Sequence, residues 1–139
     1  MIDFNYETDF ELVSETNYVD WISRVIVSEN KSLGDLSFVF CSDEYLLDIN
    51  LRYLEHDTFT DIITFDYCIG NVVSGDIFIS IDRVKDNSKI FNVSFDSELL
   101  KVMAHGVLHL MGYKDKTESD ISLMRNKEDE KSKLFHVEH

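Results

Sequence analysis

The sequence predicts an α+β fold, in which a single mixed sheet of about four strands packs against several helices, with one helix central. Two observations carry this prediction. Short runs of β-branched and aromatic residues, typical of strands, alternate with longer segments whose apolar residues recur every three or four positions, typical of helices. Two of the strand-like runs follow each other directly, which predicts a hairpin and therefore an antiparallel pair within the sheet.

The chain begins with a predicted strand and a predicted helix. Residues 2–7 alternate in polarity, as the residues of a strand do. A helix is expected to run to about Asn30 from Ser14 or Thr16, either of which can cap its first turn. Residues 31–34, which end in a glycine, predict a turn.

A second strand and a second helix are expected next. Residues 36–42 predict a buried strand, and Ser42, which is followed by two acidic residues, is expected to cap the helix. The expected apolar face of this helix consists of Leu46, Leu47, Ile49 and Leu54. Residues 56–61 are polar and predict a loop.

The predicted hairpin and the remaining helices complete the chain. Residues 61–67 and 76–81 are expected to form its strands, joined by a turn at 70–75. A short helix is expected at 82–92 and a longer one at 97–111. The longer one is apolar almost all round, which is typical of an internal helix. The last helix is expected to begin at Thr117, where Asp120 can complete a capping pair, and to lie at the surface because it is highly charged.

Length and composition predict one globular domain spanning residues 1–139. The hydrophobic content of 44% is too high for a disordered chain. No apolar run reaches membrane-spanning length and no secretory signal is visible, so we expect a cytoplasmic protein without a membrane partner. Cys41 and Cys68 form no paired motif and are expected to be free thiols.

The net charge of −14 opposes nonspecific binding to nucleic acid, which depends on neutralising phosphates. An RNA partner would therefore need a local patch of basic residues. The sequence offers Arg83, Lys85 and Lys89 in one stretch, and Lys114 with Lys116 in another.

The clearest chemical signal is the stretch HGVLHLMGYKD, residues 105–115. On a helix, His105 and His109 lie one turn apart on the same face. Gly112 allows a sharp turn, after which Asp115 can approach the two imidazoles. Three such ligands leave an open position, as in catalytic zinc sites, and a metal-bound water is the expected nucleophile. Nickel, copper or cobalt would also suit these donors.

One position argues against a protease. Zinc proteases with a similar ligand spacing carry a glutamate directly after the first histidine, where it acts as the general base. Gly106 occupies that position here. Because glycine cannot transfer a proton, the peptidase interpretation weakens while the metal interpretation stands.

The same stretch resembles the signature of the YbeY-type endoribonucleases, also called rRNA maturation factors. The matching residues are His105, Gly106, Leu108, His109, Leu110, Gly112 and Tyr113. TDIITF (60–65), GDIFIS (75–80) and Asn50 resemble further family segments, in the same order. The family's usual Asp-His pair is replaced by Lys114 and Asp115, and its arginine by Leu54, with Arg52 nearby but out of register.

The resemblance implies a metal-dependent, single-strand-specific endoribonuclease, a hydrolase of phosphodiester bonds. It would act in small-subunit rRNA 3′-end maturation and ribosome quality control, with ribosomal RNA and the small ribosomal subunit as partners. The implied cofactor is one divalent metal ion, with zinc expected, held by His105, His109 and Asp115. The candidates for RNA contacts are Arg52, His56, Lys85 and Lys114.

Two other functions are open from the sequence. One is a metallohydrolase acting on peptides or small molecules. The other is a non-catalytic ribosome assembly factor with a structural zinc, which would require a fourth protein ligand. Asp61 and Asp76, which begin the two hairpin strands, serve either as turn and capping residues or, with Thr60, as lining of the cleft.

Overall fold

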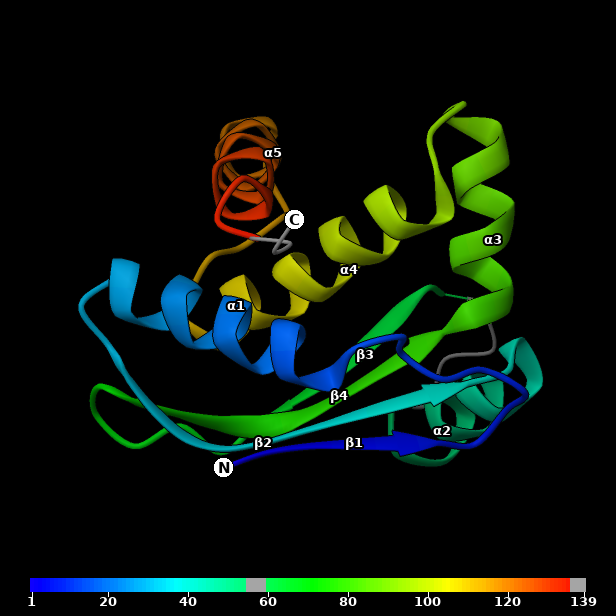
Figure 1. Ribbon diagram of the computed structural model, residues 1–139, viewed down its shortest axis with the longest axis horizontal. Helices are drawn as coiled ribbons and strands as arrows, with labels where there is room; N and C mark the ends of the chain where they lie inside the picture. Colours follow the sequence, from blue (N-terminus) through cyan, green and yellow to red (C-terminus); the bar gives the residue numbers. More distant parts are fainter. Residues whose placement is uncertain (55–59, 136–139) are drawn as a thin grey trace.

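The computed structural model describes residues 1–54 and 60–135. Within them, four strands form one sheet in the order β1-β2-β4-β3 (Figure 1). β1 and β4 both pair in parallel with β2, whereas β3 pairs antiparallel with β4. The bounds are Ile2–Tyr6 for β1, Ser32–Cys41 for β2, Ile62–Asp66 for β3 and Val72–Ser80 for β4. The predicted α+β fold with a mixed four-stranded sheet is confirmed.

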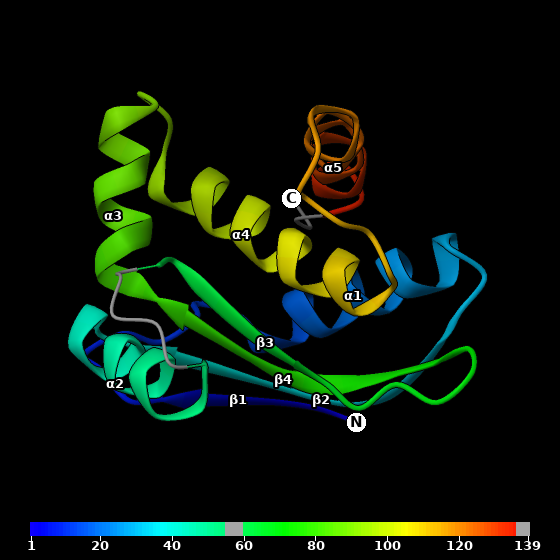
Figure 2. The same ribbon diagram turned by 180° about the vertical axis from the view of Figure 1, so that it is seen from behind.

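Helices cover the two faces of the sheet unequally. α1 and α4 lie on one face and α2 lies on the other, while α5 lies over α4 on the side away from the sheet (Figures 1 and 2). α3 follows directly from β4 and stands beside the start of α4. The bounds are Glu15–Ser28 for α1, Asp43–Leu54 for α2, Ile81–Ile90 for α3, Phe95–Leu110 for α4 and Glu118–Ser132 for α5.

The main core lies between the sheet and the α1–α4 layer. Phe38 and Phe40 of β2 face Trp21 of α1 and Met103 of α4 in one buried cluster. Burying such large aromatic side chains is the dominant stabilising contribution. The predicted internal position of the helix with the two histidines is confirmed, because α4 contributes nine buried residues to the structure.

Serine and threonine side chains set the helix starts, much as predicted. The hydroxyl of Ser42 accepts a hydrogen bond from the Tyr45 amide at 3.2 Å. Thr117 and Asp120 form a reciprocal capping box at the start of α5. Ser14 precedes α1, but its side chain makes no capping hydrogen bond.

Several predicted boundaries are wrong. Three of the four residues of the turn predicted at 31–34 belong to β2, which begins at Ser32. β2 pairs with β4 on both sides of an irregularity between Leu33 and Leu36. The glycine there permits close strand approach, since a Cβ at Gly34 would overlap the Ser74 hydroxyl. β4 likewise begins earlier than predicted, at Val72. Of the turn predicted at 70–75, only Gly70 and Asn71 therefore form a turn.

Two predictions about burial also need correction. Leu54, expected on the apolar face of α2, is exposed at the last residue of the helix. α5 is not wholly a surface helix, because it packs on α4 and buries Met124, Glu128 and Lys131. Cys41 and Cys68 are free, as predicted. No helix in the described ranges is long and apolar enough to cross a membrane.

Candidate metal centre

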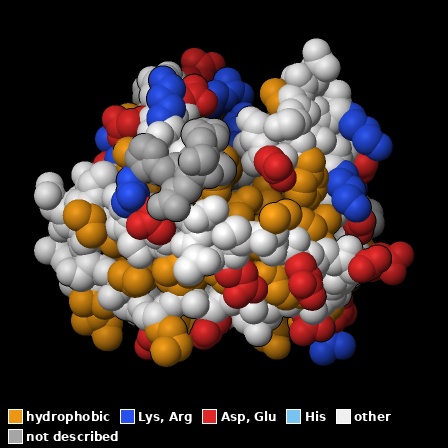
Figure 3. Space-filling view, viewed as in Figure 1, with side chains coloured by type: hydrophobic (Ala, Val, Ile, Leu, Met, Phe, Trp, Pro, Cys, Tyr) orange, Lys and Arg blue, Asp and Glu red, His pale blue; other side chains and the backbone are white. Residues whose placement is uncertain are grey.

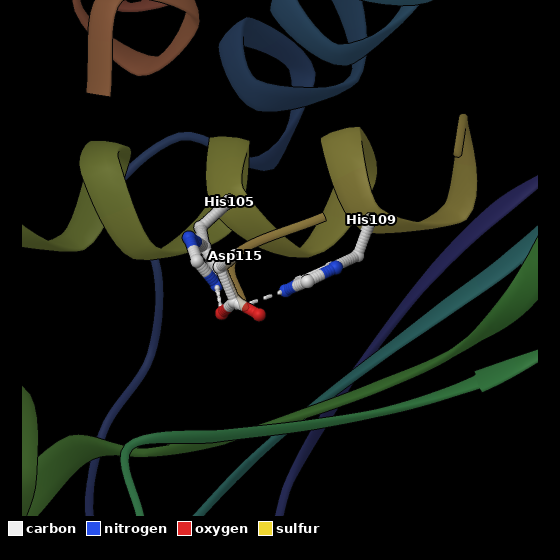
Figure 4. Close-up of side chains that lie close together, drawn as sticks. All are labelled: His105, His109 and Asp115. Atoms are coloured by element: carbon white, nitrogen blue, oxygen red, sulfur yellow. Dashed lines mark hydrogen bonds and ion pairs between the residues drawn. The ribbon is translucent and has the colours of Figure 1, made fainter. Parts of the chain in front are cut away.

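Helix α4 and the loop after it bring the three predicted ligands together. His105 and His109 project from one face of α4, and their ring centroids lie 4.5 Å apart. Gly112, with φ of +99°, turns the chain back after the helix, and the following loop carries Asp115. Asp115 Oδ2 lies 3.5 Å from His105 Nε2 and 3.3 Å from His109 Nε2 (Figure 4).

These distances suit a bound metal ion. One atom from each of the three residues lies within 4.8 Å of the others. Ligand atoms about 2.1 Å from a tetrahedral zinc lie roughly 3.4 Å apart, close to both measured Nε2–Oδ2 separations. The three donors could therefore hold a zinc ion without large movement of the backbone.

The second nitrogen of each imidazole already has a partner. His105 Nδ1 lies 2.5 Å from Glu128 Oε2, and His109 Nδ1 lies 2.9 Å from the Tyr113 carbonyl oxygen. A carboxylate or carbonyl in this position accepts the Nδ1 hydrogen and leaves Nε2 free to bind a metal. Both Nε2 atoms point toward the Asp115 carboxylate (Figure 4).

The cleft beside the histidines is rich in carboxyl groups. It has a volume of about 300 Å³ and is lined in part by Asp61, Glu98, Asp115 and Glu128, together with His105. Carboxyl groups gathered beside two imidazoles produce a negative potential, which favours a divalent cation. The walls of the cleft therefore agree with the donor set.

Burial and neighbouring charges shift several pKa values in this cleft. Burial raises the pKa of Asp61 and that of Glu98. Burial lowers the pKa of His105, but the hydrogen bond and charge of Glu128, with smaller effects from Asp61 and Asp115, outweigh it and leave that pKa raised. The acidic surroundings thus favour positive charge at His105.

Helix α5 is anchored by a polar network next to the centre. Lys131 is buried and pairs with Glu29, just after α1, at 2.8 Å, while its carbonyl accepts a hydrogen bond from the Trp21 indole. Glu29 also accepts a hydrogen bond of 2.5 Å from the Tyr113 hydroxyl. The network ties the end of α1, α5 and the loop after α4 together, and so fixes the position of Glu128.

Gly106 lies where α4 packs against the side chains of β3 and β4. A Cβ at this position would come within 2.8 Å of Ile62 Cδ1 and 3.0 Å of Ile77 Cγ2. A glutamate side chain at position 106 would therefore point into packed β3 and β4 side chains. The residue that serves as general base in the proteases has no room in this helix packing.

The predicted RNA contacts are not gathered at the cleft. Arg52 is exposed on α2 and pairs with Asp48 at 3.1 Å, and Lys85 and Lys114 are exposed and are not among the residues that line the cleft. His56 lies outside the described residues. Residue type and position in the sequence suggest these residues, but neither specifies which face of an element a residue occupies.

Of the other described residues singled out in the sequence, only Asp61 lies at the cleft. Asp61 lines the cleft, whereas Asp76 lies in a different pocket with Tyr53 and Tyr67. Thr60 precedes Asp61 but is absent from the residues that line the cleft. Arg83, from the proposed basic stretch, forms an ion pair with Asp43 at 2.6 Å.

Sequence reasoning missed Glu128, Glu98 and Lys101. Glu128 shares a helix face with the buried Met124, but a charged residue in a charged helix gives no sign of burial. Lys101 offered a better signal, because it lies four residues before His105 and therefore on the same face of α4.

Comparison with known proteins identifies the family of this chain and supports its fold. The family described as Endoribonuclease YbeY matches residues 3–136. The chain belongs to the YbeY family. A protein named Endoribonuclease YbeY from Flavobacterium johnsoniae is 61% identical over 138 residues, covering 99% of both chains. Its namesake from Flavobacterium psychrophilum is 60% identical over 137 residues, covering 99% of this chain and 98% of the relative.

A solved structure with the same fold lies further away in sequence. The solution structure of TM1509 from Thermotoga maritima superposes with a TM-score of 0.68, covering 97% of this chain and 89% of that one. The two sequences share 23% identity, so this similarity concerns the fold alone. The resemblance inferred from the residues of the motif is confirmed at the level of the family by the family match and the close relatives.

Proposed function

We propose that this YbeY-family protein is a metal-dependent endoribonuclease that cleaves single-stranded RNA. Its role would be small-subunit rRNA 3′-end maturation and ribosome quality control, on the small ribosomal subunit in the cytoplasm. The observation that carries the proposal is the convergence of two imidazole Nε2 atoms on the Asp115 carboxylate, at the edge of an acidic cleft.

The donor set favours zinc as the cofactor, bound by His105, His109 and Asp115. When bound there, a divalent metal supplies a Lewis acid that polarises a phosphate oxygen and makes water a better nucleophile near pH 7. The protein's own residues orient the donors. Glu128 holds His105 Nδ1, and the Tyr113 carbonyl holds His109 Nδ1, so that neither ring can rotate freely.

Two features argue against the other candidate functions. Among the described residues, the group of convergent donors has three members, whereas a structural zinc generally has four protein ligands. The packing around Gly106 leaves no room for the base that peptide hydrolysis requires. Since the motif supplies no general base for RNA either, turnover on naked RNA is expected to be slow or assisted by a partner.

The proposal is tested by assaying purified protein on matched single-stranded and double-stranded RNA. We expect internal cleavage of the single strand, loss of activity after chelation and recovery after zinc is added back. His109→Ala should be inactive, whereas Glu118→Gln, an exposed carboxyl exchange on α5, should retain activity. Equal cleavage by His109→Ala and the native protein would refute a metal-dependent ribonuclease.

The ribosomal role needs a cellular test. In a bacterial strain lacking its own family member, the native chain should restore mature 3′ ends of small-subunit rRNA, and His109→Ala should not. Normal restoration by His109→Ala would instead indicate a non-catalytic assembly factor.

A further inference from the structure

We propose that Phe91 and Lys101 form a nucleotide-binding subsite beside the metal centre. An unpaired RNA base would stack on the exposed Phe91 ring, and the adjoining phosphate would contact the Lys101 ammonium. This inference rests on the proposed ribonuclease function and assigns residues to its substrate-binding side, where the residues expected from the sequence are not gathered.

Lys101 is aligned with the metal ligands on helix α4. Lys101, His105 and His109 are spaced four residues apart, so their side chains follow one face of the helix in successive turns, about 6 Å apart along the axis. Lys101 also lines the same cleft as His105 and Asp115. A strand whose scissile phosphate lies at the metal centre therefore passes within reach of this ammonium.

Phe91 presents an aromatic face next to Lys101. It follows the last residue of α3, and 55% of its surface is exposed. The Lys101 ammonium lies 5.3 Å from the centre of its ring. An aromatic ring with a cation beside it can take both parts of a nucleotide, since bases stack on aromatic side chains and phosphates pair with ammonium groups.

The subsite is continuous with both the metal centre and a larger groove. Phe91, Glu98 and Lys101 line the cleft beside His105, and they also line a groove of about 550 Å³ that runs between α4, α5 and the turn after α3. Figure 3 shows the surface dipping between α5 and the tip of α3, with basic side chains on the α5 side. The residues that line this groove include Lys133. The cleft and groove together form a path for an extended strand.

Charge explains why the base would contribute more than the phosphate. Among the described residues, Lys101 makes no ion pair, unlike Lys127 and Lys131, which pair with Glu29. The groove also presents the carboxyl groups of Glu98 and Asp129, so its cations are balanced rather than in excess. Binding would depend mainly on stacking, and only a base free of a duplex partner can stack in this way.

The first test measures steady-state cleavage of a short single-stranded RNA. Phe91→Ala should raise KM roughly ten-fold or more with little change in kcat, because it removes a stacking contact made equally in the ground state and the transition state. Phe91→Tyr should behave like the native protein. Ile90→Ala, which removes a neighbouring and more exposed apolar side chain, is the matched control and should leave KM unchanged.

The second test separates the base from the phosphate by equilibrium binding in the presence of a chelator. An RNA with one abasic nucleotide should bind the native protein more weakly, yet should lose nothing further with Phe91→Ala. Lys101→Gln should lower the slope of log affinity against log salt by about 0.7, whereas Lys89→Gln, outside the groove, should not. Phe91→Trp provides a direct fluorescence signal, because RNA that stacks on the exposed indole should quench its emission. The native Trp21 is buried and should contribute little to this change.

The outcomes distinguish this subsite from the proposed function. If the native protein cleaves RNA while Phe91→Ala and Lys101→Gln keep its KM and salt dependence, the subsite is wrong and the ribonuclease proposal stands. If these variants impair only rRNA maturation in cells, the groove serves a protein partner and the subsite is equally wrong. If the native protein neither binds nor cleaves RNA, both proposals are refuted.

Discussion

Glu128 of α5 is hydrogen-bonded to Nδ1 of His105 on α4, at 2.5 Å. The two residues are 23 positions apart, so the candidate metal centre depends on the packing of α5 against α4 as well as on the local motif. A buried carboxylate in this position holds the imidazole with Nε2 toward the other ligands. The C-terminal helix is therefore part of the site.

This contact predicts that Glu128→Gln weakens metal binding without removing a ligand. Loss of such an outer hydrogen-bond partner typically lowers metal affinity about 10- to 100-fold. Competition with a chromogenic chelator measures the affinity, and the exposed Glu118→Gln on the same helix is the control. If Glu128→Gln binds zinc as tightly as the native protein does, the contact does not orient His105.

The turn at Gly112 predicts coupling between backbone conformation and metal affinity. Gly112 has φ of +99° and Gly70 has φ of +58°, and a Cβ added at either position would meet no other atom within 4 Å. Alanine at either position should cost about 1–2 kcal/mol of stability through backbone strain alone. Only Gly112→Ala should also lower metal affinity, because it alone displaces Asp115. Equal metal affinity in both variants would contradict this role of the turn.

The packing of α4 predicts a severe effect of Gly106→Glu. The new carboxylate would be buried against Ile62 and Ile77 without a partner, which should lower the free energy of unfolding by about 3 kcal/mol or more. Urea denaturation measures this change, and a peptidase assay should detect no new activity. A stable variant that hydrolyses peptides would favour the metallohydrolase alternative.

The network around Glu29 predicts acid sensitivity. Burial opposes ionisation of Glu29, but hydrogen bonds from Lys131 and Tyr113 outweigh it and lower its pKa from 4.5 to about 2. Because the folded pKa is depressed, the stabilisation is present above about pH 4.5 and is lost as the pH falls toward 2. The difference in unfolding free energy between native protein and Glu29→Gln should thus be on the order of 3 kcal/mol at about pH 7 and shrink below about pH 4.5. A difference that does not change with pH would exclude this ion pair as its source.

Local patterns were enough to predict the elements and the metal motif. The hairpin strands, the capping pair at Thr117 and Asp120, and the helical spacing of His105 and His109 all depend on residues close in sequence. Such short-range signals are set by backbone geometry and by capping hydrogen bonds, which the sequence displays directly.

Features that depend on tertiary packing could not be predicted in this way. The start of β2 at Ser32 depends on its pairing with β4, and the burial of Glu128 depends on where α5 packs. The RNA candidates Arg52 and Lys85 failed to gather at the cleft for the same reason, since their orientation is decided by elements distant in the chain.

The central claim is that His105, His109 and Asp115 bind one metal ion, and elemental analysis of the purified protein tests it most directly. The native chain should contain about one zinc per molecule, while His109→Ala and Asp115→Ala should contain little. Equal metal content in the native protein and His109→Ala would contradict the account.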